Sequence, residues 1–213
     1  MLIRHATPQD AAILAKIILL AGRAHVKKGI WEVVLNDTAE ECEVFLRHLL
    51  ITVKPHLFHY SCYLIAEVAG IGPVGGLGGY DPRVSGYQAL QQVIPEVYEK
   101  LSLSKQALRD AQERASRILA CLPEEIDGAW TIDSVAVIPE HREKGAAEML
   151  LHKILEKGKR KGYLKAQVNM YIGNEPALNL YNKFDFKIIE ENRDTYFEEN
   201  IGAPGMLSLI KYL

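Results

Sequence analysis

The chain has 213 residues, a formal net charge of −2 and a sequence pI near 6.4, and 48% of its residues are hydrophobic. A balance this close to neutral argues against a general nucleic-acid binder and against a membrane-surface protein. The hydrophobic share is sufficient for a sizeable buried core.

The spacing of cysteines and histidines predicts neither disulfides nor a metal site. Cys42, Cys62 and Cys121 are far apart, odd in number and without a CxxC or Cys/His ligand spacing. His56 and His59 lie three positions apart with no further ligand nearby. We expect reduced thiols and no metal.

The chain carries no targeting or membrane signal that its sequence reveals. No apolar run approaches the length of a membrane span, and the opening MLIRHATPQD has no processing site. We therefore expect a cytoplasmic protein. Without repeats or low-complexity segments, residues 1–213 are expected to form one domain.

The first part of the chain predicts a strand and two helices. Residues 2–6 form a strand candidate, and Thr7 is a suitable cap for a helix that ends near Gly22. Residues 23–37 have no clear periodicity and are expected to be irregular. A second helix is expected over residues 38–51, because acidic residues lie in its first turn.

A hairpin and a helical insertion follow. Residues 60–68 and 74–80 predict two strands joined by a Gly- and Pro-containing turn. The second strand contains four glycines, which weaken a strand unless the backbone must bulge or be approached closely. Residues 86–122 predict two helices, too few residues for an independent core. This insert could form a lid, a homodimer surface or a site for another partner.

The remaining elements complete an α/β domain. Residues 130–138 predict a strand that leads through a short turn into a helix ending near Lys161. A strand at 164–171 and a helix capped by Asn174 come next. The last strands are expected at 186–190 and 206–212, joined by a polar loop. This order favours a mixed sheet flanked by helices.

The turn before the long helix is a candidate anion site. The first N–H groups of a helix lack internal partners, and the helix dipole adds positive potential there. Gly145, Ala146 and Ala147 would let a phosphate approach those groups closely. The pattern GxxxxGK followed by Ser or Thr is absent.

The strand before this turn carries an unexpected carboxylate. Simple alternation places Thr131, Asp133, Val135 and Val137 on one face, and both faces are largely apolar, as in a strand covered on both sides. Burying Asp133 is costly unless the carboxylate is paired or functional.

Two segments in combination resemble the GNAT family of N-acetyltransferases. VAVIPEHREKGAAEMLL contains the family's Q/R-x-x-G-x-G/A signature at residues 142–147, and NEPALNLYNKFDF fits its N-x-x-A-x-x-L-Y-x-K-x-G-F pattern at 174–186. Glu143 and Asp185 stand where the family usually has glycine. The resemblance covers most of the chain, except for residues 81–127 and much of 23–59.

The resemblance implies the fold and the cofactor site. The fold is expected to be GNAT-like, with a mixed, mostly antiparallel sheet of about seven strands and a helical insertion at about 81–127 between the third and fourth strands. Acetyl-CoA is the implied co-substrate, and its pantetheine arm requires the fourth and fifth strands to splay. The implied cofactor-binding residues are Val135, Ala136, Val137, Arg142, Glu143, Lys144, Gly145, Ala146, Ala147 and Asn174.

The resemblance also implies direct attack of an amine on the thioester in a ternary complex. Tyr181 lies where the family often has the general acid, and the alternative is a packed tyrosine with no chemical role. An amine must lose a proton before it attacks, and Asp133 is our candidate base. Glu67 and His25 are alternative bases, and a purely structural role for Asp133 remains open.

The acceptor is expected to be a small-molecule amine or a protein or peptide amine. Its pocket is expected to involve residues 23–36, 79–86 and 191–205. Two other functions remain open at this point: a CoA-binding regulatory or interaction protein without transfer activity, and an unrelated α/β domain that binds a phosphate ligand.

Overall fold

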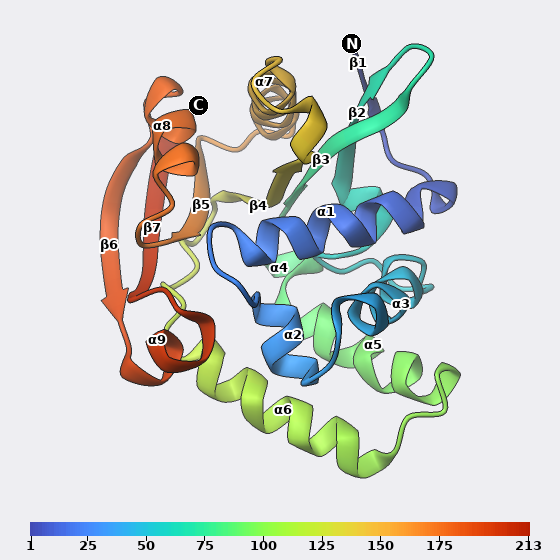
Figure 1. The fold of residues 1–213 in the computed structure, drawn as a ribbon. Coiled ribbons are helices and arrows are strands. Elements are labelled where there is room, and N and C mark those ends of the chain that lie inside the picture. The colour runs from blue at the N-terminus through green and yellow to red at the C-terminus, as the bar shows by residue number, and fades with distance from the viewer.

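A computed structural model describes all residues from 1 to 213. Its centre is a seven-stranded sheet in the order β1-β2-β3-β4-β5-β7-β6, in which only the β4–β5 pair is parallel (Figure 1). The strands are β1 (Leu2–His5), β2 (Tyr63–Val68), β3 (Gly72–Tyr80), β4 (Trp130–Val137), β5 (Lys165–Tyr171), β6 (Lys187–Arg193) and β7 (Gly205–Tyr212). The expected mixed, mostly antiparallel α/β sheet is confirmed.

Helices cover both faces of the sheet. The first hydrophobic core joins α1 and α3 to one face, and the second joins α7 and α8 to the other. The helices are α1 (Ala11–Arg23), α2 (Ile30–Leu35), α3 (Ala39–Leu50), α4 (Pro82–Ser85), α5 (Tyr87–Lys100), α6 (Lys105–Leu119), α7 (Ala146–Arg160), α8 (Glu175–Lys183) and α9 (Thr195–Ile201).

The insert between β3 and β4 packs against the rest of the chain. Leu90, Val93 and Val97 of α5 and Ala111 of α6 belong to the same core as α1 and α3. Figure 1 shows α5 and α6 at one end of the molecule, together with α2, α3 and α9. The insert therefore closes one end of the molecule and does not form a core of its own.

Two short helices lie where the sequence predicted irregular chain. The prediction for residues 23–37 missed α2, whose N-cap Gly29 donates its N–H to Glu32, while Arg23 also pairs with Glu32. The Gly29–Glu32 bond is a local cap, but the Arg23–Glu32 pair and the burial of Trp31 depend on the fold, and six residues show no clear periodicity. The polar loop expected before β7 contains α9, capped by the Asp194 side chain, which accepts a hydrogen bond from the Phe197 N–H.

Gly79 of β3 and Gly158 of α7 lie where the helix approaches the sheet closely. A Cβ added at Gly79 would lie 2.5 Å from the Ile154 side chain of α7, and one added at Gly158 would lie 2.8 Å from Trp130. Real Cβ atoms do not come so near other atoms. The small residues therefore set the distance between α7 and the sheet.

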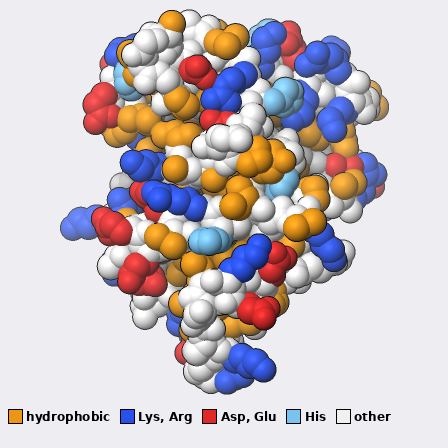
Figure 2. All heavy atoms as spheres, turned by 90° about the vertical axis from the view of Figure 1, so that its right-hand side faces the viewer, with side chains coloured by type: hydrophobic (Ala, Val, Ile, Leu, Met, Phe, Trp, Pro, Cys, Tyr) orange, Lys and Arg blue, Asp and Glu red, His pale blue; other side chains and the backbone are white.

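The outer surface is of mixed character. On the face drawn in Figure 2, Lys and Arg side chains are interspersed with Asp and Glu, and hydrophobic side chains lie between them. No helix has the length and hydrophobicity that crossing a membrane requires. Cys42, Cys62 and Cys121 are all buried free thiols.

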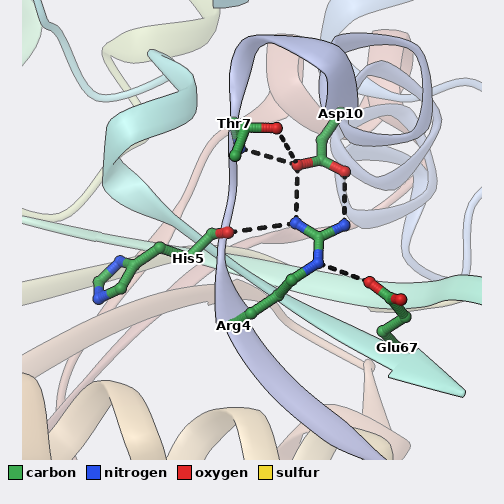
Figure 3. A network of polar contacts seen from close by, with 5 residues as sticks. All are labelled: Arg4, His5, Thr7, Asp10 and Glu67. Atoms are coloured by element: carbon green, nitrogen blue, oxygen red, sulfur yellow. Dashed lines mark hydrogen bonds and ion pairs between the residues drawn. The ribbon is translucent and has the colours of Figure 1, made fainter.

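Arg4 ties the N-terminal strand to its neighbours (Figure 3). Its guanidinium donates two hydrogen bonds of 2.8 Å to Asp10 and a third bond to Glu67 of β2. Asp10 also accepts from the N–H and hydroxyl of Thr7, which closes the turn into α1. The hydrogen bonds from Arg4 lower the pKa of Asp10 to about 2.

Asp10→Asn should lower the free energy of unfolding by about 1–3 kcal/mol at neutral pH, because Arg4 loses a buried charged partner. The folded-state pKa lies below the ordinary value, so this stability is present above roughly pH 4 and is lost as the pH falls toward 2. Urea unfolding at several pH values measures it, with exposed Asp185→Asn as control. A difference between wild type and Asp10→Asn that stays constant down to pH 2 would contradict the assignment.

Candidate functional site

The parallel strands β4 and β5 separate part-way along their length. They pair only at Trp130–Ala166, Thr131–Gln167 and Ile132–Val168. Beyond Ile132, β4 continues to pair with β3 but not with β5. The edge of β4 that faces β5 is therefore free from Asp133 onward, which is the splay that the sequence resemblance required.

A cavity of about 340 Å³ lies at this opening. Its wall contains Asp133 and Val135 of β4, the helix cap Asn174, and Tyr181 of α8. Four residues from separate parts of the sequence-based site are thus brought together around one space. The remaining cofactor candidates do not line this cavity: Ala136 and Val137 lie further along β4, and residues 142–147 form the turn into α7.

A bulge in β4 changes which side chains share a face. Ser134 has φ of 51°, and the register with β3 shifts between Gly76–Ala136 and Gly78–Asp133. As a result Val135 and Val137 pack in the core beneath α7, with Ile132, while Ala136 packs on the opposite core. The prediction that Asp133 shares a face with Val135 and Val137 was wrong, because an extra residue in the strand reverses the alternation.

Asp133 lies half-buried on the cavity wall. The Ser134 hydroxyl donates a 2.7 Å hydrogen bond to Oδ1 of Asp133, and no Lys or Arg pairs with it. Burial raises the pKa of Asp133, while the hydrogen bonds from Ser134 partly oppose that rise. A carboxylate whose pKa is raised in this way is a better proton acceptor than an exposed one.

Tyr181 faces the same space from α8. Its ring packs against Phe186 with centroids 5.6 Å apart, and the side chain is buried. The Tyr181 side chain lines the cavity. Burial, and then the nearby charge of Asp133, raise the pKa of Tyr181, so the phenol stays protonated.

Asn174 caps α8, the helix that carries Tyr181, by accepting a 3.3 Å hydrogen bond from the Ala177 N–H.

The turn into α7 presents a row of free donors. The backbone N–H groups from Glu143 through Glu148 make no hydrogen bond to any protein acceptor. Arg142 secures the turn by donating from Nε to the Val137 carbonyl at 3.1 Å. Consecutive free N–H groups at a helix N-terminus favour an anion.

Left-handed backbone explains the two departures from the family pattern. Glu143 has φ of 60° and Asp185 has φ of 61°, which glycine adopts most easily. Both side chains are exposed, so neither blocks a cavity or a donor. Gly145, with φ of 79°, has open space where a side chain would begin.

The two alternative bases lie elsewhere. Glu67 is held by Arg4 at the β1–β2 edge, as Figure 3 shows, and does not line the cavity. His25 is exposed and also does not belong to the cavity wall. Of the three candidate bases, Asp133 is therefore the one that lines the cavity together with Tyr181.

The cavity wall includes residues that the sequence did not predict. Tyr87, Leu119, Leu122, Pro123 and Glu125 come from the insert and the segment after it. Of the expected acceptor segments, 23–36 and 79–86 contribute, whereas 191–205 does not. No local signal identifies these insert residues, because their position depends on how α5 and α6 pack.

The family comparison agrees with this geometry. A model of the Acetyltransferase (GNAT) family matches residues 54–186. The chain belongs to the GNAT acetyltransferase family. GNAT membership supports acyl transfer in general and confirms the resemblance seen in the sequence. No curated protein matches the chain by sequence.

Solved structures share the GNAT fold over the whole chain. An N-acetyltransferase from Staphylococcus aureus Mu50 is 21% identical, with a TM-score of 0.71, and covers 99% of this chain and 100% of its own. The ribosomal-protein-alanine N-acetyltransferase from Brucella melitensis is 17% identical, with a TM-score of 0.56 and complete coverage of both chains. Rv2747 from Mycobacterium tuberculosis, solved in complex with CoA and NLQ, is 9% identical, with a TM-score of 0.52, and covers 100% of this chain and 99% of its own.

No three His, Cys, Asp or Glu side chains lie where they could hold a metal ion together. His56 and His59 are buried, and the His56 ring lies within hydrogen-bond distance of Thr52 and the Leu49 carbonyl. These two histidines have a structural part in the α3–β2 connection.

Asp133 should titrate above the ordinary value for an aspartate, and Ser134→Ala should raise its pKa further, because the ionised carboxylate loses a hydrogen bond. Carbon-13 NMR of the aspartate carboxyls measures this, with Asp133→Asn to assign the signal. A titration at or below the ordinary value, or a lower pKa in Ser134→Ala, would contradict this description of the site.

Proposed function

We propose that this chain transfers an acetyl group from acetyl-CoA to an amine acceptor by direct attack in a ternary complex. The observation that carries the proposal is the opening between β4 and β5, which has Asp133 and Tyr181 on its wall. A row of free N–H groups lies at the turn that follows the same strand.

The cofactor is proposed to bind along the free edge of β4. The backbone of Val135, Ala136 and Val137 would hold the pantetheine arm as an added strand, since this edge has no β5 partner. The N–H groups at residues 142–147 would hold the pyrophosphate. Asn174, on the cavity wall, would contact the arm.

The chemistry requires a neutral amine. At pH 7 an alkylamine is almost fully protonated, and deprotonating it costs about 4–5 kcal/mol. Asp133 is proposed to take that proton, directly or through water, which leaves a lone pair for attack on the thioester carbonyl. The carbon–nitrogen bond forms and the carbon–sulfur bond breaks.

Tyr181 is proposed to protonate the departing thiolate. Its side chain lines the cavity, and its raised pKa keeps the proton in place until the sulfur develops charge. A protein that only binds CoA needs no phenol at this position. Tyr181 therefore favours an enzyme over the alternative of a CoA-binding regulatory protein.

The direct test is to incubate the protein with acetyl-CoA and a panel of primary amines, including a peptide amine, and to detect free thiol. Thiol release that depends on the amine is expected. Binding of acetyl-CoA without thiol release for any amine would support the regulatory alternative, and no binding would overturn both.

Tyr181→Phe should lower kcat by roughly 10²-fold, the lower end of the range for a lost general acid, with little change in acetyl-CoA affinity. Tyr163→Phe is the matched control, because Tyr163 donates to Asp81 away from the cavity and should retain the wild-type rate. A normal rate in Tyr181→Phe would remove this tyrosine from the mechanism.

Gly145→Glu should weaken acetyl-CoA binding at least tenfold, because a carboxylate then stands among the donors proposed for the pyrophosphate. Gly162→Glu is a matched control: Gly162 also has positive φ and open space around it, but lies beyond the other end of α7. Calorimetric titration with CoA measures both. Equal affinities of the two variants would contradict the proposed cradle.

A further inference from the structure

The insert helices line a second, partly open cavity, which the proposed chemistry does not use. It has a volume of about 730 Å³ and lies between α2, α3, α5 and α6. Its wall is hydrophobic apart from Gln91, Gln112 and Ser116, and no charged side chain lines it. A hollow of this size is typical of a small-molecule site that holds an uncharged apolar group.

The two cavities adjoin. Ile30, Trp31, Phe58, Tyr87 and Leu119 line both of them. Trp31 and Phe58 pack together here with ring centroids 4.9 Å apart. The transfer cavity beside Asp133 and the cavity between the insert helices therefore share part of one wall.

Charge distinguishes the two ends of this combined space. Asp133 and Glu125 are the only charged side chains on the wall of the transfer cavity, and neither cavity is lined by a Lys, Arg or His. Tyr87 lines the same cavity as both carboxylates, and burial, followed by the charges of Asp133 and Glu125, raises its pKa. A cation is stabilised at this end, and an anionic ligand has no partner in either cavity.

We propose that the insert cavity binds the apolar body of the acceptor, so that the substrate is a hydrophobic primary amine. The ammonium end lies between Asp133 and Glu125, and the uncharged alkyl or aryl body extends past Tyr87 into the insert cavity. The inference rests on the proposed acyl transfer and adds the substrate class. A long acyl chain on CoA is the competing occupant, but a neutral chain gains nothing from the two carboxylates.

The test uses linear primary amines from propylamine to octylamine with acetyl-CoA as donor. Each added methylene should raise kcat/KM by about fourfold, mainly through KM, until the cavity is filled. An amine that ends in a carboxylate should be a poor acceptor at every length. The same protein is assayed with propylamine and with acetyl-, butyryl- and hexanoyl-CoA to test the competing occupant.

Two variants separate the apolar and the charged contributions. Ala115→Phe places a ring in the insert cavity and should lower kcat/KM for octylamine at least tenfold more than for propylamine. Glu113→Phe, on the exposed side of the same helix, adds the same ring outside the cavity and should not discriminate between the amines. Glu125→Gln should raise KM for all amines by a similar factor, whatever their length.

Binding of octylamine and propylamine is measured in parallel by calorimetry and by tryptophan fluorescence, to which Trp31 on the wall of both cavities contributes. If no amine is acetylated, the proposed function fails, while tighter binding of octylamine that Ala115→Phe abolishes would still support the apolar site. Equal rates and equal affinities along the amine series would overturn the inference and leave acyl transfer standing. A preference for hexanoyl-CoA that Ala115→Phe removes would assign the cavity to the acyl chain and overturn it as well.

Discussion

The separation of β4 from β5 is the constraint on which the rest of the site depends. Parallel pairing stops after Ile132, so the backbone beyond it has hydrogen-bonding groups on one edge without a strand partner. Unpaired backbone inside a protein is costly unless another group satisfies it. An extended ligand arm can do so, and the cavity at the opening provides the room for one.

The bulge at Ser134 determines which side chains of β4 face the cavity. The reversal of the strand's alternation lets Asp133 remain on the face toward the cavity while Val135 and Val137 pack beneath α7. In a strand without a bulge, side chains two positions apart point to the same face. Asp133 would then share a face with Val135 and Val137, and it could not line the cavity while they pack beneath α7. The left-handed Ser134 also brings its hydroxyl onto the Asp133 carboxylate.

The position of α7 relates the anion cradle to the cavity. Small residues at Gly79 and Gly158 let the helix approach β3 and β4 closely, and Leu150, Leu151 and Ile154 fill the core beneath it. The free N–H groups at its start are thereby held beside the end of β4. On the other face, the insert supplies walls to both cavities and contributes to the same core as α1 and α3. The same helices of the insert therefore build both the cavity walls and part of the hydrophobic core.

The sequence by itself determined the strand–turn–helix and the mixed sheet, because caps, turn glycines and hydrophobic periodicity are local signals. It determined the family through the two motifs at residues 142–147 and 174–186. Thr38, Asn174 and Gly145 each specify the backbone of their own neighbours. It also predicted that Asn174 and Tyr181 belong to one site, through the resemblance, and that Asp133 joins them, through the need for a base on the preceding strand.

Only the tertiary structure decided how those residues face one another. The bulge at Ser134 has no signature in the sequence, since serine rarely adopts positive φ, and it overturned the predicted face of Asp133. The short helices α2 and α9 and the cavity walls from the insert were missed for a related reason. Their positions depend on contacts between segments far apart in the chain, such as Trp31 with Phe58 and Arg117 with Tyr196, and no local pattern records such contacts.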